Sequence, residues 1–227
     1  MTPDFENTPS LGRGIYTVPD IAHLLDIPYY KANRWINEYW DRRLAYNLSQ
    51  RYSWTDGKAK AVSFHTLVEL YTFFQLSQVG VRTNKILEAH KVLARQFDTA
   101  FPFATSYVLN NMFTDGRSIF LDEVENPIIT LDISFQLNLD FVKLFFKKLE
   151  FDSGELANRL WPLGKDRNIV IDPQYKFGQP TINGTNILPS TIASLIKAGE
   201  TEDFVMSLYN LEQRQVHDAL EFHKLAA

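Results

Sequence analysis

The sequence contains no cysteine among its 227 residues. Disulfide bonds, thiolate catalysis and cysteine-ligated zinc are therefore excluded. It also lacks any run near the roughly 20 apolar residues that a membrane-spanning helix needs. The first residues, MTPDFENTPSLGRG, have neither the basic nor the apolar region of a signal peptide. We therefore expect a cytoplasmic protein without membrane contact.

Motifs of common catalytic sites are missing as well. The sequence has no P-loop, no GxGxxG turn and no Ser/His/Asp arrangement. His217 and Glu221 are four residues apart with His223 nearby, but no further ligand follows at a suitable spacing. We interpret these histidines as packing or surface residues, and the acidic cluster within residues 122–125 as a solvated loop. We expect no catalytic residue, no cofactor and no metal, and hence no enzyme.

The composition is that of an ordinary globular protein, with 45% hydrophobic and 22% charged residues. The net charge of −4 is unevenly distributed. Residues 29–60 hold seven basic and three acidic side chains, whereas residues 166–227 hold five basic and eight acidic ones. This asymmetry favours a basic part that reads nucleic acid joined to an acidic body, with ordinary solvated faces as the alternative.

A helix-turn-helix is predicted near the N-terminus. Thr17 and Asp20 can form a capping box, the apolar residues within 21–25 share one helical face, and residues 26–28 (Asp-Ile-Pro) end the helix. A second helix follows at once. Its predicted buried stripe, spaced i, i+3, i+4 and i+7, consists of Ala32, Trp35, Ile36 and Tyr39. Two short helices joined by a tight turn make this motif.

The other face of the second helix carries side chains that suit DNA. These side chains are Tyr30, Lys31, Asn33, Arg34 and Asn37. Asn and Arg can bond bidentately to adenine and guanine edges, while Lys and Tyr suit phosphates. A merely solvated face more often alternates Glu with Lys, and here only Glu38 is acidic. We interpret this face as a DNA-reading surface, with a solvated face as the alternative.

A β-hairpin is predicted over residues 51–62, because the Asp56-Gly57 pair is typical of a type I′ turn. Its basic Lys58 and Lys60 and the aromatic Trp54 suit a wing that lies along a phosphate backbone. The predicted DNA-contacting residues are Tyr29, Tyr30, Lys31, Asn33, Arg34, Asn37, Arg42, Arg43, Arg51, Trp54, Lys58 and Lys60.

Two more helices follow the hairpin. We expect Ser63 to cap the first, Gly80 to end it and Thr83 to cap the second. The elements over residues 14–97 are carried by the segments IAHLLDIPYYKANRWI, RYSW and VSFHTLVELYTFFQLSQVGVRTNKILEA. The order of these elements resembles that of the MerR family of regulators. The resemblance implies a winged-helix domain that binds promoter DNA. MerR regulators dimerise through a long helix after this domain, and the periodic stretch 84–97 is short for that role.

Residues 98–167 are expected to form a small α+β connecting segment. Residues 118–121 and 128–131 are predicted to be strands around a turn-rich stretch. The spacing of an amphipathic helix is found at Leu139, Val142, Phe145, Phe146 and Leu149.

Residues 168–227 predict a β-hairpin followed by three helices. The strands are 168–172 and 180–182, with an Asn-Gly turn directly after the second. The first helix starts near Pro189 and ends at Gly199, and Thr201 caps the second. In the second helix the residues expected to face inward are Phe204, Val205, Leu208 and Tyr209. In the third they are Val216, Ala219 and Leu220.

This C-terminal region resembles the short domain of VapB-like antitoxins, whose pattern is I-x-x-x-P, G-x-P-x-I-x-G-T and three helices. The matching residues are Pro173, Gly178, Pro180, Ile182, Gly184, Thr185, Gly199, Glu200, Tyr209, Leu211, Val216, Ala219 and Leu220. The resemblance implies a partner toxin of the PIN-like ribonuclease type. Asn186 departs from the pattern, which usually has Arg after the Gly-Thr pair.

The sequence therefore predicts a mainly α protein with small β elements. The expected domains are 14–97, a MerR-like winged helix; 98–167, the connecting segment; and 168–227, the antitoxin-type domain. The leading hypothesis is an antitoxin that neutralises a PIN-like toxin and represses its own operon, as a homodimer or a toxin–antitoxin hetero-oligomer. Two alternatives stay open. One is a MerR-like regulator that senses a small ligand or another protein through its C-terminal part, and the other is a protein–protein adaptor.

Overall fold

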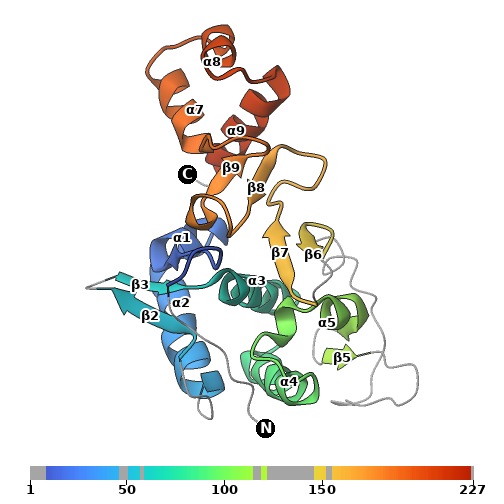
Figure 1. Cartoon of the computed structure of the whole chain (residues 1–227). Helices are drawn as coiled ribbons and strands as arrows, with labels where there is room; N and C mark the ends of the chain where they lie inside the picture. Colours follow the sequence, from blue (N-terminus) through green and yellow to red (C-terminus); the bar gives the residue numbers. More distant parts are fainter. Residues whose placement is uncertain are drawn as a thin grey trace.

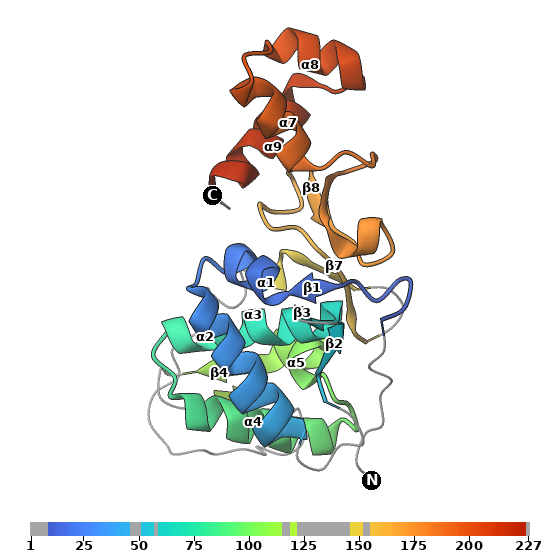
Figure 2. The same cartoon turned by 90° about the vertical axis from the view of Figure 1, so that its left-hand side faces the viewer.

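The computed structural model of this chain describes residues 9–45, 51–56, 59–114, 119–121, 146–151 and 155–225. Over these residues helices predominate, and the strands form three small antiparallel sheets. The predicted class, mainly α with small β elements, is confirmed. The ribbon has two lobes, with the C-terminal helices above the N-terminal ones (Figures 1 and 2). No helix within the described ranges has the length and apolar character needed to cross a membrane.

The N-terminal lobe contains the predicted helix-turn-helix and hairpin. Its elements are β1 (Tyr16–Thr17), α1 (Val18–Leu24), α2 (Tyr29–Arg34), η1 (Trp35–Leu44), β2 (Ser53–Asp56), β3 (Ala59–Val62), α3 (Phe64–Gln78) and α4 (Thr83–Gln96). Strands β2 and β3 pair from Ser53↔Val62 to Asp56↔Ala59, and β1 joins the other edge of β3. The β2–β3 hairpin, called the wing below, projects sideways from the lobe (Figure 1).

Helix starts follow the local sequence closely. Thr17, Ser63 and Thr201 each accept a hydrogen bond from a backbone N–H in the first turn, and Asp20 completes the capping box at Thr17. The prediction that Thr83 caps α4 is wrong. Thr83 is already the first helical residue, and the preceding Arg82 occupies the cap position without a side-chain capping bond.

The core of this lobe lies between α3, α4 and the helix-turn-helix. Its largest fully buried side chains include Trp40, Phe64, Phe73 and Phe103. A buried polar pair joins α3 to α4, with Nε2 of His90 2.6 Å from Oε2 of Glu69. The second carboxylate oxygen of Glu69 accepts the N–H of Phe103 at 2.7 Å. Burying such a pair is favourable only with additional hydrogen bonds. The Phe103 N–H supplies one to Glu69, whereas Nδ1 of His90 is buried without a partner among the described residues.

The described part of residues 98–167 packs on the same core. Its elements are η3 (Pro102–Ala104), α5 (Ser106–Asn111), β4 (Met112–Thr114), β5 (Ile119–Leu121), β6 (Leu149–Phe151) and β7 (Ala157–Leu160). Strand β5 confirms the predicted strand at 118–121. The predicted strand 128–131, the acidic cluster within 122–125 and most of the predicted helix 139–149 lie outside the described residues. The three domain boundaries stay predictions.

The C-terminal lobe is a hairpin with a three-helix bundle. Its elements are β8 (Ile169–Ile171), η4 (Lys176–Gly178), β9 (Pro180–Ile182), α7 (Pro189–Lys197), α8 (Glu202–Tyr209) and α9 (Gln213–Leu225). Strands β6, β7, β8 and β9 form one sheet in that order, which continues from the lower lobe into the upper one (Figure 1). A second apolar cluster consists of Ile169, Ile182, Ile192, Val205, Leu211, Val216, Ala219 and Phe222.

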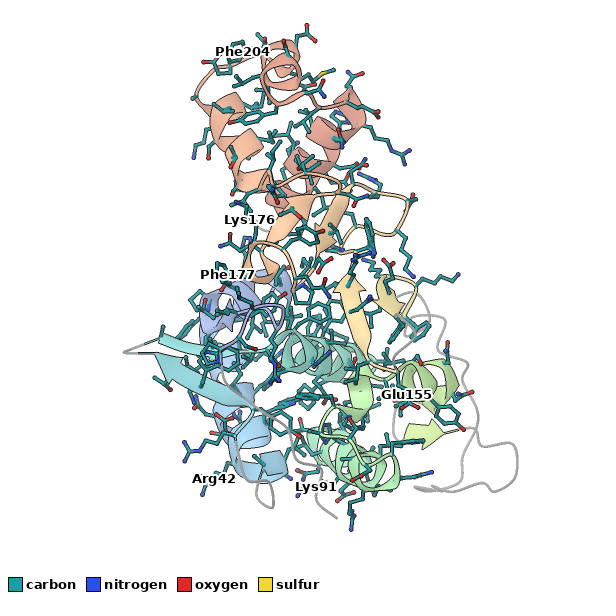
Figure 3. The ribbon with its side chains drawn as sticks, viewed as in Figure 1. Arg42, Lys91, Glu155, Lys176, Phe177 and Phe204 are labelled. Atoms are coloured by element: carbon teal, nitrogen blue, oxygen red, sulfur yellow. The ribbon has the colours of Figure 1, made fainter. Side chains whose placement is uncertain are left out.

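Two inward-facing predictions in α8 are wrong. Phe204 and Leu208 are 48% and 55% exposed, whereas Val205 is fully buried and Tyr209 is half-buried. Helix α8 is only two turns long and contacts the bundle along a narrow stripe centred on Val205. The apolar side chains of Phe204 and Leu208 are therefore left on the surface. Phe204 lies at the end of the molecule farthest from α4 (Figures 1 and 3).

The two lobes meet at a left-handed turn in η4. Lys176 and Phe177 both have positive φ angles, 48° and 57°, which are rare for residues with a side chain. The carbonyl of Phe177 accepts the N–H of Ile15 at 2.8 Å. At Gly178 an added Cβ would lie 2.1 Å from the hydroxyl oxygen of Tyr16, so only glycine permits this close approach.

Candidate nucleic-acid interface

Helix α2 continues directly into η1, whose backbone is π-helical. At its end the N–H of Ala45 donates to the carbonyl of Trp40, five residues earlier. Such i→i+5 helices are rare and are found frequently at functional sites. Because each of their turns holds more residues than an α-helical turn, side chains four and five positions apart share a face.

A wide face of large apolar residues is buried along η1. The predicted residues Trp35, Ile36 and Tyr39 are buried, and Trp40 and Leu44 are buried with them. In an α-helix Trp35 and Trp40 would point roughly 140° apart around the axis. In the π-helical register both rings contact Phe73, with centroids 4.8 and 5.3 Å from its ring.

Charged residues at the end of α2 and along η1 gather on another face. The guanidinium groups of Arg34 and Arg43, nine positions apart, both lie over the ring of Tyr39, at 5.8 and 5.9 Å from its centre. These side chains form one wall of a surface hollow of about 570 Å³. We call this hollow the basic groove; its lining residues are Arg34, Glu38, Tyr39, Arg42, Arg43, Arg82, Thr83 and Asn84.

The second wall of the basic groove is the start of α4. Its first N–H groups lack a side-chain cap, since Arg82 makes no capping bond. Uncapped N–H groups and the positive end of the helix dipole attract anions. An arginine cluster beside a helix N-terminus is a suitable arrangement for phosphate oxygens.

The arginines of the groove differ in their neighbours. Arg34 Nε lies 2.9 Å from Glu38 Oε2, and this hydrogen bond raises the pKa of the guanidinium, so Arg34 is cationic. Arg43 donates to Asn84 Oδ1 at 3.1 Å. Arg42 and Arg82 are exposed, and no described residue forms an ion pair with either. Figure 3 shows Arg42 at the edge of the N-terminal lobe. These two are the side chains most available to a ligand.

The predicted reading residues of α2 lie near one another. Tyr29 and Tyr30 are 55% and 72% exposed at its first turn. The ammonium of Lys31 lies over the Trp35 ring, 5.2 Å from its centre. Asn33 is half-buried beside Asn37, whose amide nitrogen donates to Asn33 Oδ1 at 2.8 Å. Of the predicted α2 residues, Arg34 is the one that lines the basic groove.

The predicted residues of the wing are more dispersed. Arg51 is exposed just before β2, and Trp54 is half-buried on it. Lys58 lies outside the described residues. Lys60, on β3, donates to Asp41 at 3.1 Å and to Asn37, so the wing contacts η1.

Sequence reasoning missed Arg82 and Asn84. Both follow the Gly80 turn, and their position opposite η1 depends on how α4 packs. The π-helical register of η1 is likewise not signalled by the sequence, because the whole buried set also fits an α-helical period; it consists of Trp35, Ile36, Tyr39, Trp40 and Leu44.

Comparisons with known proteins concern both halves of the chain. Residues 169–223 match the model of a family described as "Protein of unknown function (DUF433)". Over 233 aligned residues, 99% of this chain and 96% of the relative, the sequence is 26% identical to "Uncharacterized protein Rv2308" of Mycobacterium tuberculosis. Over 83 residues, 36% of this chain and 35% of the relative, it is 28% identical to "Putative antitoxin VapB45" of the same organism.

The fold is similar to that of a solved protein. The X-ray crystal structure of Rv2018 from Mycobacterium tuberculosis superimposes with a TM-score of 0.64 at 16% identity. The match covers 90% of this chain and 96% of the other, so the similarity of fold extends over both lobes.

Proposed function

We propose that this chain is an antitoxin that binds promoter DNA through its N-terminal lobe and a ribonuclease toxin through its C-terminal lobe. It would act by binding alone, without catalysing a reaction. The observation that carries the DNA half is the basic groove beside the helix-turn-helix, with four arginines and one glutamate among its lining residues. The similarity to the VapB45 protein and the matched C-terminal family segment support the antitoxin half.

In this proposal the groove holds backbone phosphates. Arg42, Arg82 and the first N–H groups of α4 bind phosphate oxygens, which fixes the register of the protein on the duplex. The exposed start of α2, with Tyr29, Tyr30 and Asn33, then faces the major groove, as the recognition helix does in helix-turn-helix proteins bound to DNA. The wing lies along the neighbouring phosphates, in keeping with the MerR-like order of elements.

The toxin-binding surface is proposed on α8. Its exposed Phe204 and Leu208 are four residues apart, and Glu200, Glu202 and Asp203 lie beside them. No ion pair to these three carboxylates is found within the described part of the chain. A ribonuclease must present basic groups to hold a polyanionic RNA. An apolar centre with an acidic rim is complementary to such a surface.

Co-expression with the product of the adjacent reading frame tests the proposal. We expect a stable complex, loss of RNA cleavage by that partner and protection of the chain's own promoter in a footprint. The double variant Arg42→Ala/Arg82→Ala should lose the footprint and keep the complex. Arg95→Ala, a surface arginine on the far end of α4, is the matched control. A partner without ribonuclease activity, or no footprint in the parent protein, would refute the respective half.

A second function is favoured by a different hollow. A pocket of about 300 Å³ in the C-terminal sheet is lined by polar groups that include Arg159, Asp172, Thr181, Asn183 and Thr185. Such a pocket suits a regulator that senses a small ligand. In that case the affinity for promoter DNA would change with a small molecule and stay constant when a toxin is added.

A further inference from the structure

We propose that Asn33 is a specificity-determining residue that offers DNA a hydrogen-bond donor, and that Lys60 in the wing fixes this polarity. The inference rests on the DNA-binding function proposed above. It concerns a chain of hydrogen bonds that runs from β3 through η1 to α2.

The chain begins at a tightly held ammonium group. Lys60 Nζ donates to Asp41 Oδ2 at 3.1 Å and to Asn37 Oδ1. The Asp41 side chain is only 5% exposed, and it also accepts the N–H and hydroxyl of Ser53 at 3.0 and 2.6 Å. The Asp41 carboxylate therefore joins both strands of the wing to η1, and the Lys60 ammonium is held against Asn37.

The direction of every bond in the chain follows from Lys60. An ammonium group only donates, so the Asn37 atom that it meets is the carbonyl oxygen. The amide nitrogen of Asn37 then faces Asn33 and donates to its backbone carbonyl and its Oδ1, both at 2.8 Å. This bond uses one of the two lone pairs of the Asn33 side-chain oxygen and turns that oxygen toward Asn37, so the NH₂ group is the end of the Asn33 amide turned away from Asn37.

This polarity restricts what Asn33 can read. A free asparagine can bind adenine bidentately, accepting from N6 and donating to N7. With its oxygen turned toward Asn37, Asn33 does not present oxygen and NH₂ side by side to one adenine, and the partner of its NH₂ group is a major-groove acceptor such as purine N7, guanine O6 or thymine O4. Both ends of the Asn37 amide take part in this series of hydrogen bonds, so Asn37 is not the residue that contacts a base. The sequence alone had predicted both asparagines as readers.

The test uses the full chain and duplexes selected from a random pool. The preferred duplex is then remade with base analogues that each lack one major-groove acceptor. At one position we expect an analogue to lower the affinity of the parent protein about fivefold, the value of one hydrogen bond. Asn33→Ala should be insensitive to that analogue.

Lysine variants separate positioning from general loss of charge. Lys60→Met releases the Asn37 amide, so the analogue penalty should fall and selection at that position should shift toward adenine. Lys60→Arg keeps a donor-only cation and should restore the parent pattern. Lys91→Met, at an exposed position of α4 beyond its first turn, is the control and should select as the parent does. Unfolding curves establish whether each variant is folded. If Lys60→Met does not fold, Lys60→Gln is used in its place.

Two failures are distinguishable. If the parent protein selects no duplex at all, the proposed DNA binding is wrong, and this inference falls with it. If the parent selects a duplex but folded Lys60→Met keeps the parent pattern, the positioning role is overturned while DNA binding stands. Sensitivity of Asn33→Ala to the same analogues would overturn the role of Asn33.

Discussion

Single residues in the basic groove have distinct tasks. Arg34 is oriented by Glu38 and by the Tyr39 ring, so its guanidinium is held near the reading face of α2. Arg42 and Arg82 are exposed and suit phosphates. A base-reading arginine changes sequence preference, whereas a phosphate-binding arginine changes affinity for all sequences alike.

Arg34→Ala is expected to lower the affinity for the promoter site by about 1–3 kcal/mol, because a bidentate contact to guanine is lost. Binding titrations with the specific duplex and a scrambled one measure the effect. Arg95→Ala should change neither affinity. An unchanged footprint and an unchanged specific affinity would remove Arg34 from the reading role.

His65 makes the stability of the protein depend on pH. It lies in the first turn of α3, 5.3 Å from the ring of Phe101. Burial lowers its pKa from 6.5 to about 4, a hydrogen bond to the backbone of Ala157 opposes this shift, and the charge of Arg13 adds to it. The unfolded chain therefore binds a proton at higher pH than the folded one. The contribution of neutral His65 is complete above pH 6.5 and is lost as the pH falls toward 4.

Denaturant unfolding at several pH values checks this expectation. The free energy of unfolding should fall more steeply between pH 6.5 and 4 in the parent protein than in His65→Gln, which has no ring to protonate. Parallel curves for the two proteins over this window would show that His65 does not carry the pH dependence.

Among the elements, α9 is attached to the start of the β8–β9 hairpin by one carboxylate. Asp218, 3% exposed, accepts the N–H and side-chain amide of Asn168 at 2.8 and 2.7 Å and lies 2.6 Å from Arg167 Nε. Burial by itself raises the pKa of Asp218, but these hydrogen bonds outweigh burial, and the pKa is lowered below 3.8. The stabilisation is present above that pH and is lost as the pH falls through the folded pKa.

Asp218→Ala is expected to lower the free energy of unfolding by about 2–3 kcal/mol, because it leaves Asn168 and Arg167 without their acceptor. Glu221→Gln is the matched control. Glu221 is the exposed partner of the same arginine, and its loss should cost less than about 1 kcal/mol. Equal losses in the two variants, measured by urea unfolding, would contradict the structural role of Asp218.

Elements whose signals are local could be predicted from the sequence, and those set by packing could not. The caps at Thr17, Ser63 and Thr201 depend on neighbouring residues and were predicted correctly. The π-helical register of η1 depends on the fit of Trp35 and Trp40 against Phe73 of another helix, so a 3.6-residue period could not show it. The buried stripe predicted from that period was correct. The exposure of Phe204 on α8 likewise depends on how the bundle closes.

At the scale of the whole molecule, the two proposed surfaces lie on different lobes. The basic groove is on the N-terminal lobe, and α8 is at the far end of the C-terminal lobe (Figure 1). The candidate site was predictable in part. Arg34, Arg42 and Arg43 were among the predicted DNA-contacting residues, but Arg82 comes from α4, which meets η1 only in the folded chain.

The double variant Phe204→Asp/Leu208→Asp should weaken capture of the toxin at least about tenfold and leave DNA affinity and the unfolding midpoint unchanged. Removing apolar contacts at the centre of an interface has this effect, while both side chains are already exposed in the free chain. Leu11→Asp, an exposed leucine on the other lobe, is the control in the same pull-down. Full capture by the double variant would place toxin binding elsewhere.

The central claim is that the basic groove binds a phosphate backbone. The most direct measurement is the affinity of the full chain for its own promoter duplex at stepped salt, from about 50 to 200 mM. The account predicts a steep linear fall of log K with log salt, and a slope that is smaller by about two in Arg42→Ala/Arg82→Ala. A slope near zero in the parent protein, or the same slope in both proteins, would contradict it.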